Sequence, residues 1–300
     1  MNSSSFSRRW LLRAIPALLC GIPELALGAP EVSSDGQFAA IERGIGGRLG
    51  VAAIDTGSGR RLVYRAEELF AMCSTFKLLL AAGILKNVDD GSSELNKPIR
   101  YTEKDLLEYA PVTRAHVQQG AMTVSELCAA AIEFSDNTAA NLLLAQLGGP
   151  AGLTQFIRSL GNRVTRLDRI EPDLNSALPG DPRDTTSPMA MAESAAMLLT
   201  GTSLSVTSRN RLAGWLEKSV TGANRLRAGF PAAWRAGDKT GTGEHGAIGD
   251  VGIFWPPSKP PIVVAAYIME GNATGAEREE AIAASGRVTA NAMVATTPVS

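Results

Sequence analysis

Ser74-Thr75-Phe76-Lys77-Leu78-Leu79-Leu80-Ala81-Ala82 is the stretch around which the rest of the chain can be placed. Its apolar residues are good helix formers and predict a buried helix over 76–86. Ser74 and Lys77 are three residues apart, so they project from one helix face about one turn from each other. A serine at a helix N-terminus is well placed for a developing oxyanion, and a lysine with a lowered pKa can accept its proton. An ordinary helix start with a solvated lysine would show the same residues, so this pattern needs support from elsewhere.

The composition sets the outer limits on function. The chain has 300 residues, of which 45% are hydrophobic and 20% charged, enough for one large core or two modest ones. A formal net charge of -1 argues against nucleic acid as the main partner. No apolar run reaches transmembrane length. The two histidines and three cysteines lack ligand spacing, so we expect no metal site and no cofactor.

Residues 1–29 have the composition of an export signal rather than of a folded segment. The paired arginines Arg8 and Arg9 precede a short apolar stretch, which resembles a twin-arginine signal. A general secretory signal with incidental arginines is the alternative. Small residues near the end of the segment offer a cleavage site. We therefore expect a periplasmic or secreted monomer, exported by the twin-arginine route and without stable membrane association.

Strand patterns occur at both ends of the chain, with helical patterns between them. The expected strands are Arg48–Asp55, Arg61–Tyr64, Trp234–Thr240, Ile248–Trp255 and Pro261–Met269. Helices are expected over 38–45, 76–86, 123–133, 138–147, 151–160, 188–199 and 277–294. The economical architecture is an α/β fold of the α+β type: a five-stranded antiparallel sheet with flanking helices plus an inserted all-helical domain. The corresponding domains are 30–66 with 217–295, and 67–216.

Two further motifs stand between and after the helical segments. Ser135-Asp136-Asn137 connects two expected helices and could aim a hydroxyl and an amide into a cleft, although all three residues are also good helix caps. Lys239-Thr240-Gly241-Thr242-Gly243 lies on a late edge strand, where a lysine, hydroxyls and permissive glycines suit an anionic ligand. A β-turn with an exposed lysine is the alternative for this second motif.

A Pro-rich segment between Arg169 and Asp184 supplies a fourth element. Glu171 and Asn175 are four residues apart, so a carboxylate and an amide can face one point and hold a water molecule. The segment is otherwise without a helical or strand pattern and predicts an Ω-loop. Arg169 and Asp184 at its ends could close the loop by a salt bridge.

In this order, the Ser-x-x-Lys, Ser-Asp-Asn and Lys-Thr-Gly motifs match those of the penicillin-recognising serine enzymes. With Glu171 and Asn175, the chain from about Phe38 to Val294 closely resembles the class A serine β-lactamases. Tyr109-Ala110-Pro111-Val112-Thr113 and the segment that begins at Asp184 also look like family segments. The resemblance is nearest to the branch with cysteine before the nucleophile.

The resemblance implies an enzyme that hydrolyses the β-lactam amide bond of penicillins and cephalosporins and confers resistance to them. Ser74 would attack the carbonyl and become acylated, with Lys77 and Glu171 as rival bases for that step. The backbone N–H groups of Ser74 and Thr242 would form the oxyanion hole. Ser135 would relay the proton to the departing ring nitrogen.

The resemblance also implies the substrate-binding residues. Asn137 would hold the side-chain amide of the substrate, and Glu171 with Asn175 would activate the water that frees the enzyme. The substrate carboxylate and the rest of the binding site would be contacted by Tyr109, Arg225, Lys239, Thr240, Gly241 and Thr242. The only partners implied are small-molecule β-lactams.

The chain departs from the family pattern in three ways. Many members carry an arginine where this chain has Ile248, and Arg225 is expected to supply that guanidinium. Cys128 matches one half of a family disulfide, but Ala81 stands at the partner position, so we expect no disulfide. Some carbapenem-hydrolysing members have a disulfide between the cysteine before the nucleophile and the position of Gly243. This chain cannot form that disulfide, which weighs against strong carbapenem hydrolysis.

Two other functions share the fold. A DD-peptidase or esterase would be acylated but would lack the deacylating water, against which Glu171 and Asn175 argue. A β-lactam sensor domain would stay acylated and is usually tethered to a membrane. Turnover of nitrocefin separates the three by sustained hydrolysis, slow hydrolysis or one stoichiometric burst.

Overall fold

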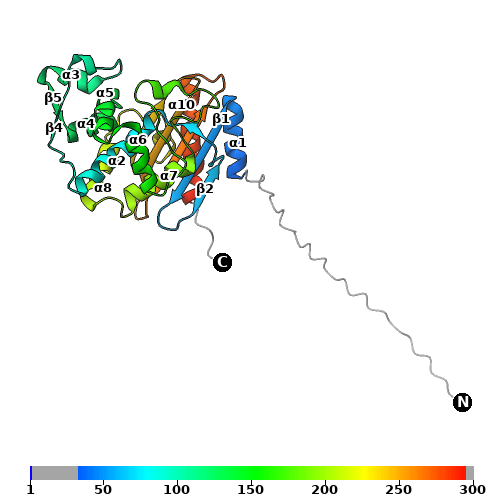
Figure 1. Ribbon diagram of the computed structural model, residues 1–300. Coiled ribbons are helices and arrows are strands. Elements are labelled where there is room, and N and C mark those ends of the chain that lie inside the picture. The colour runs from blue at the N-terminus through cyan, green and yellow to red at the C-terminus, as the bar shows by residue number, and fades with distance from the viewer. Residues whose placement is uncertain (2–32, 295–300) are drawn as a thin grey trace. The chain divides into compact units, whose positions relative to one another are not determined.

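A five-stranded antiparallel sheet forms the centre of the computed structural model, which describes Met1 and residues 33–294 (Figure 1). The export segment inferred for 1–29 lies outside the described residues, apart from Met1. The strand order is β2-β1-β9-β8-β7. The strands are β1 Arg48–Asp55, β2 Arg61–Tyr64, β7 Arg235–Thr242, β8 Ile248–Trp255 and β9 Ile262–Met269. The predicted sheet is confirmed, and β7 is displaced from the expected 234–240 so that it includes Gly241 and Thr242.

The register of the sheet joins the two ends of the chain. β1 pairs with β9 along its whole length, from Arg48 opposite Met269 to Asp55 opposite Ile262. The inner positions of β1 and all positions of β9 are buried, so these strands read as apolar runs rather than as alternating ones. β7 is an edge strand, as predicted, and it places the Lys239 motif at the border of the sheet.

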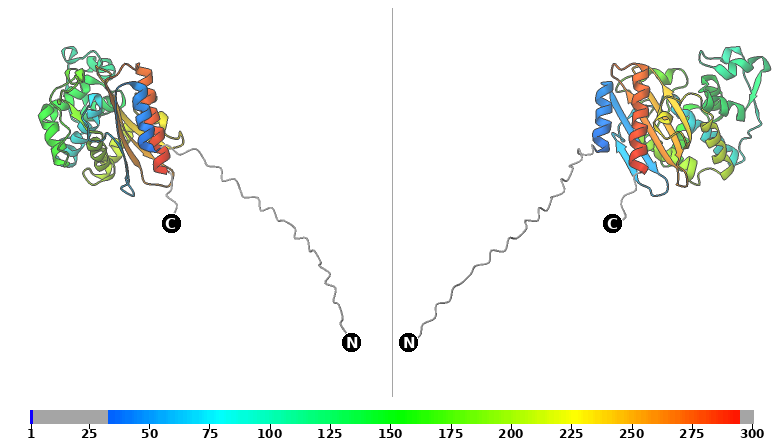
Figure 2. Two further views of the ribbon diagram at one scale, coloured as in Figure 1. Left: turned by 90° about the vertical axis from the view of Figure 1, so that its right-hand side faces the viewer. Right: turned by 180° about the vertical axis from the view of Figure 1, so that it is seen from behind.

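Terminal helices cover one face of the sheet. α1 (Ser34–Ile45) and α10 (Gly275–Val294) pack against each other there, as Figure 2 shows. The short α9 (Leu226–Gly229) packs against α10 and against β7 and β8. The apolar cluster beneath these helices includes Phe38, Leu49, Leu226, Phe254, Val264 and Ile282.

The helical layer covers the opposite face. Its helices are α2 Phe76–Asp89, α3 Pro111–His116, α4 Val124–Glu133, α5 Asn137–Gln146, α6 Gly149–Ser159, α7 Pro188–Thr200 and α8 Val206–Glu217. Single turns of 3-10 helix occur at η1 Cys73–Thr75, η2 Glu103–Asp105, η3 Val117–Gln119 and η4 Asp173–Ser176. The remaining strands, β3 Phe70–Ala71 with β6 Thr185–Thr186 and β4 Pro98–Arg100 with β5 Ala121–Thr123, form two short antiparallel pairs. The helices α3 and α8 and these short pairs were not predicted as elements.

α2 is the axis of the helical layer. Its first ten residues, Phe76–Leu85, are all buried, because α4, α5, α6, α7 and α8 pack around it. A helix buried on every side needs no polar stripe, which explains its continuous apolar sequence. One expectation needs correction: Ser74 does not open α2 but lies in η1, the 3-10 turn that precedes it.

Residues from Ser33 onward group into one unit by their contacts. The boundaries drawn from the sequence (30–66 with 217–295, and 67–216) stay a prediction about how that unit is subdivided. Within the described residues, no helix combines the length and the apolar character that a bilayer span needs.

Candidate active site

Ser74 and Lys77 meet as the spacing predicted. Lys77 Nζ donates to Ser74 Oγ at 2.9 Å, and both side chains are buried. The backbone approaches Ser74 through Cys73, whose φ of +44° is unusual for a residue with a Cβ atom. This left-handed residue turns the chain from β3 into η1 and presents the serine at the start of the buried helix.

Lys77 lies at the centre of a group of oxygen atoms. Its Nζ also donates to the Ser135 carbonyl at 2.8 Å and to Asn137 Oδ1 at 2.6 Å, and it lies 3.0 Å from Glu171 Oε1. Burial lowers the pKa of Lys77, and the nearby charge of Glu171 opposes that effect. A lowered pKa favours the neutral amine, which is the form that can accept a proton from Ser74.

Within Ser135-Asp136-Asn137, Asp136 has a structural role and Ser135 faces the site. Asp136 is the N-cap of α5 and also accepts from the Val112 and Thr113 N–H groups, so the cap interpretation holds for the middle residue. Ser135 adopts φ +59°, a conformation that non-glycine residues seldom take outside functional sites. Its Oγ accepts from Lys239 Nζ at 2.9 Å.

The edge strand β7 brings the third motif against Ser74. Gly241 is required here, because a Cβ atom at this position would lie 2.6 Å from the Met72 carbonyl oxygen and 3.2 Å from the Ser74 nitrogen. Lys239 is fully buried, and burial followed by the charge of Lys77 lowers its pKa well below the ordinary value. Two lysines therefore share this small volume, one on either side of Ser135.

Arg225 supplies a guanidinium beside the end of β7. Its Nη1 donates to the carbonyls of Gly241 and Gly249, at 2.7 and 3.0 Å, and its Nη2 donates to Thr242 Oγ1 at 2.8 Å. Ile248, the position where many family members have an arginine, is opposite Thr242 in the strand pair. Arg225 therefore brings a guanidinium to the region where Ile248 supplies no charge. Arg225 also forms an ion pair with Glu279 of α10.

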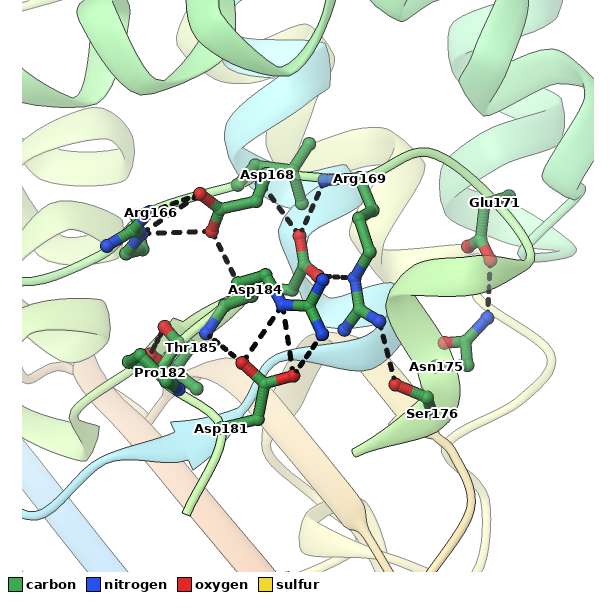
Figure 3. Close-up of polar contacts among 12 residues, drawn as sticks. Arg166, Asp168, Arg169, Glu171, Asn175, Ser176, Asp181, Pro182, Asp184 and Thr185 are labelled. Atoms are coloured by element: carbon green, nitrogen blue, oxygen red, sulfur yellow. Dashed lines mark hydrogen bonds and ion pairs between the residues drawn. The ribbon is translucent and has the colours of Figure 1, made fainter. Parts of the chain in front are cut away.

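Glu171 and Asn175 face each other as the sequence predicted, and they hold one side of the site (Figure 3). Asn175 Nδ2 donates to Glu171 Oε2, and Ser74 Oγ lies 3.3 Å from Glu171 Oε1. Asn175 Oδ1 is buried and accepts no hydrogen bond from the described protein, so it can accept one from a water molecule. The Glu171–Pro172 peptide is cis.

The loop that carries Glu171 is tied at its base, as Figure 3 shows. Arg169 Nε donates to Asp184 Oδ2 at 2.6 Å, which confirms the predicted salt bridge. Asp184 Oδ1 also accepts from the N–H groups of Asp168 and Arg169. The expectation that the loop lacks regular structure was wrong in part, since η4 forms one 3-10 turn that includes Asn175.

Sequence reasoning missed two residues that complete the site. Asn141 holds the backbone of Glu171 from both sides, because its Nδ2 donates to the Glu171 carbonyl and its Oδ1 accepts from the Glu171 N–H. A usable signal existed, since Asn141 lies four residues after Asn137 and therefore on the same face of α5. Thr221 lies in the pocket with its hydroxyl 2.7 Å from that of Thr240, and no pattern of residues around it indicated this position.

These groups open into one pocket of about 360 Å³. Its lining consists of Ser74, Tyr109, Ser135, Asn137, Asn175, Thr221, Arg225, Thr240 and Thr242. Tyr109 is half exposed at the rim, and its carbonyl accepts from the Asn137 N–H at 3.0 Å. A larger hollow of about 700 Å³ lies between Arg61 of β2, the end of α6 and α7, away from the Ser74–Lys77 pair. The chemistry of the lining, rather than size, identifies the site.

The two described cysteines, Cys73 and Cys128, are buried and unbridged, as expected. Burial raises the pKa of the Cys73 thiol to about 12, so this thiol is not a nucleophile. A Cβ atom at Gly243 would lie 2.6 Å from Cys73 Sγ, which shows how close these two positions are. The described residues contain no cluster of three or more histidine, cysteine, aspartate or glutamate side chains that could hold a metal ion.

Comparison with known proteins identifies the family of this chain. The model of the β-lactamase enzyme family matches residues 35–293. The carbapenem-hydrolysing β-lactamase KPC of Klebsiella oxytoca is 48% identical over 252 residues, which are 84% of this chain and 86% of the relative. The chain belongs to the class A β-lactamases. β-Lactamase CTX-M-8 of Citrobacter amalonaticus is 43% identical over 91% of this chain and 92% of its own length.

Solved structures of class A β-lactamases share the fold. The ancestral enzyme of Gram-negative bacteria has a TM-score of 0.85 and 55% identity, and the match covers 87% of this chain and all of that one. The putative class A β-lactamase PenP from Rhodopseudomonas palustris has a TM-score of 0.85 and 50% identity over 87% of this chain and 99% of its own. This class A β-lactamase is accordingly a β-lactam hydrolase, and its activity confers resistance to β-lactam antibiotics.

Proposed function

We propose that hydrolysis proceeds through an acyl-enzyme on Ser74, with penicillins and cephalosporins as substrates. The observation that carries this proposal is the cluster of Ser74 Oγ, Lys77 Nζ and Glu171 Oε1, in which each atom lies within 3.3 Å of the other two. A nucleophile with two adjacent proton acceptors, one buried lysine and one carboxylate, is equipped for acyl transfer.

In the first step, Ser74 Oγ attacks the β-lactam carbonyl carbon and gives its proton to Lys77 or Glu171. The carbonyl oxygen becomes an oxyanion between the N–H groups of Ser74 and Thr242. The close approach of Gly241, the residue before Thr242, to the Ser74 nitrogen supports this assignment. The C–N bond then breaks, and the ring nitrogen takes a proton through Ser135. The hydrogen bonds of Ser135 to both lysines support this relay.

In the second step, a water molecule held by Glu171 and Asn175 attacks the acyl carbonyl. Glu171 takes the proton from the water, and Ser74 Oγ leaves and is reprotonated. The free acceptor on Asn175 supports this assignment, because it gives the water a second partner beside the carboxylate.

Substrate binding is proposed on the opposite wall. Arg225, Lys239, Thr240 and Thr242 would receive the substrate carboxylate along β7, with Gly241 allowing close approach. Asn137 would hold the side-chain amide, and Tyr109 would border the entrance. The guanidinium of Arg225 and the amine of Lys239, both on or beside one strand edge, are hydrogen-bond donors that support an anionic group here.

We do not extend the proposal to strong carbapenem hydrolysis, although one relative carries that description. Gly243, the residue after β7, is the position whose Cβ atom would lie 2.6 Å from Cys73 Sγ, so the bridge found in some carbapenem-hydrolysing members has no second sulfur here. Export by the twin-arginine route, a periplasmic location and a monomeric state are also part of the proposal, and the Arg8-Arg9 pair supports the first of these.

Nitrocefin hydrolysis by the purified mature protein, followed by intact-mass measurement, tests the mechanism. We expect sustained turnover, and a transient mass increase of one β-lactam on the peptide that contains Ser74. A single stoichiometric burst would favour a sensor domain, and a slow trickle after the burst would favour a DD-peptidase or esterase. Turnover without any adduct at Ser74 under rapid quenching would contradict the acyl-enzyme.

A further inference from the structure

Asp250 is a buried acid that the proposed mechanism does not use. It lies on β8, on the same face as Ile248 and Phe254, which belong to the apolar cluster under the terminal helices. Its Oδ2 accepts from the Leu226 N–H at 3.0 Å, at the start of α9 and one residue after Arg225. Its Oδ1 is buried and has no hydrogen-bond partner in the described protein. An anion with one unpaired, desolvated oxygen would be costly in this position.

The two arginines near Asp250, Arg225 and Arg227, have their hydrogen-bond and ion-pair partners at other residues. Arg227 forms an ion pair at 2.8 Å with Asp238, the other buried carboxylate on this face of the sheet. Arg225 directs its guanidinium at Thr242, Glu279 and two backbone carbonyls. Among the described residues, neither arginine forms a hydrogen bond or ion pair with Asp250.

The titratable side chains Lys239 of β7 and Tyr267 of β9 lie on the opposite face of the sheet from Asp250, because they pair with the residues on either side of it in β8. Lys239 Nζ donates to Ser135 Oγ and the Thr240 carbonyl there, and the phenol of Tyr267 is buried. Burial, followed by the charge of Asp238, raises the pKa of Asp250 well above its ordinary value, against the opposing charges of Arg225 and Lys239.

The loop before α9 is built around these two acids. A Cβ atom at Gly222 would lie 1.7 Å from Asp238 Oδ2, so the loop backbone rests directly on that carboxylate. The Leu226 N–H donates to Asp250 directly after the turn that the Arg225 N–H closes on the Gly222 carbonyl. Arg225 lies between these two anchors, and its side chain continues to the end of β7.

We propose that Asp250 is a positioning residue that acts as a neutral carboxylic acid, fixing the start of α9, and with it Arg225, without adding negative charge beside the substrate carboxylate. This inference rests on the proposed role of Arg225 and Lys239 in binding that carboxylate. An ionised acid in the same place would hold the loop equally well but would weaken the positive potential of both cations.

The pH dependence of stability tests the proton on Asp250 without any substrate. Above about pH 4 the unfolded chain has this carboxyl ionised, whereas the folded chain keeps it protonated. The folded state then binds one proton more, so its stability falls as pH rises, relative to a variant that cannot titrate. For Asp250→Asn, the folding equilibrium constant relative to the parent should rise by up to about tenfold per pH unit between pH 5 and the folded pKa.

Asp89→Asn is the matched control for the sign. Asp89 accepts from Ser205 and Ser208 at the start of α8, and its pKa is lowered, most strongly by the Ser205 N–H among the groups that favour ionisation. Its carboxylate stabilises the fold, and this contribution grows as pH rises to about 4 and is constant above. The variant should therefore lose stability relative to the parent as pH rises to about 4 and keep a constant difference above it. A relative stability of Asp250→Asn that is flat with pH, or that falls as in Asp89→Asn, would overturn the proposal.

Infrared spectroscopy tests whether Asp250 is protonated, and kinetics test whether it positions Arg225 for substrate binding. The C=O stretch of a protonated carboxylic acid should be present in the parent at pH 7 and absent from Asp250→Asn. Asp250→Leu, which removes the acceptor, should raise KM for benzylpenicillin about fivefold with kcat retained, and Asp250→Asn should restore most of the KM. An equal loss of kcat in both variants would contradict a positioning role, and failure of Asp250→Leu to fold would leave the pH and infrared measurements to decide. If the parent enzyme did not turn over nitrocefin, the proposed function would be wrong. The role of Asp250 would still be decided by the pH dependence of stability and by the infrared measurement, because neither depends on activity.

Discussion

At the scale of single residues, Glu171 is the side chain that separates the two halves of the proposed reaction. Lys77 and Glu171 both lie within reach of Ser74 Oγ, so loss of one leaves another acceptor for the serine proton. Deacylation is different, because only the Glu171–Asn175 pair combines a carboxylate with a free amide oxygen in the pocket that the structure describes.

The first prediction follows from this asymmetry. Glu171→Ala should still be acylated by benzylpenicillin but should lose steady-state turnover, since bulk water is an unpositioned nucleophile. Mass spectrometry should then find one intact β-lactam on Ser74 for most of the protein. Asp173→Ala, which removes an exposed carboxylate two residues away, is the control and should turn over normally. If Glu171→Ala hydrolysed benzylpenicillin at the parent rate, the assignment of Glu171 would be wrong.

Arg225 carries the second prediction. Its guanidinium is almost fully buried and contacts Thr242, so its loss removes a charge beside the proposed carboxylate site. Arg225→Ala should mainly raise KM, with a loss of about tenfold to a hundredfold in kcat/KM, because a hydrogen bond to a charged group is worth roughly 1.5–3 kcal/mol. Inactivation by clavulanate should slow as well.

Arg235→Ala provides the comparison for Arg225. Arg235 begins β7, whose other end Arg225 contacts, but it pairs with Glu217 at the surface, and its loss should leave kcat/KM unchanged. An unchanged kcat/KM in Arg225→Ala would mean that Lys239 and the threonine hydroxyls suffice for the carboxylate.

At the scale of elements, the loop from Arg169 to Asp184 is held by one buried acceptor. Asp184 accepts from two backbone N–H groups and from Arg169, and its side chain is 1% exposed. Asp181 and Arg183 form another ion pair in the same loop, with Arg183 half exposed. Surface pairs contribute little to stability, whereas loss of one partner of a buried pair leaves the other uncompensated.

The third prediction compares these two ion pairs. Asp184→Ala should lower the free energy of unfolding by about 3 kcal/mol, and it should slow deacylation because Glu171 loses its fixed position. Limited proteolysis within the loop should become faster. Arg183→Ala should change neither property, and similar effects of the two substitutions would show that the base of the loop is not the point where it is fixed.

Elements differ in how far the sequence predicts them. β1, β2 and β8 were predicted with their observed bounds, because β1 and β8 are largely apolar and β2 returns from the glycine-containing turn after β1. The short helix α3 was missed because its form depends on distant acceptors: Asp136, twenty-three residues away from Thr113, receives its first N–H groups. Asn141 was missed for a related reason, since its role depends on where the loop folds back.

At the scale of the whole molecule, the site depends on the closure of the sheet by the two ends of the chain. β7 can press Gly241 against the Ser74 turn only if β8, β9 and β1 are paired behind it. The ordered motifs predicted which residues would come together in the candidate site. The distances between them, such as the contact of Arg225 with Thr242, could not be predicted without the packed structure. Such contacts are set by long-range packing rather than by local pattern.

The last prediction concerns the route by which the whole molecule reaches its substrates. β-Lactams act outside the cytoplasm, so the proposed enzyme protects a cell only if it is exported, and Arg8-Arg9 ahead of a short apolar stretch resembles a twin-arginine signal. Replacing both arginines by lysine keeps the charge that a general secretory signal requires but removes the pair. The double variant should leave uncleaved precursor in the cytoplasm and abolish resistance, whereas purified mature enzyme made from it should be fully active. Periplasmic activity equal to that of the parent would instead assign export to the general secretory route.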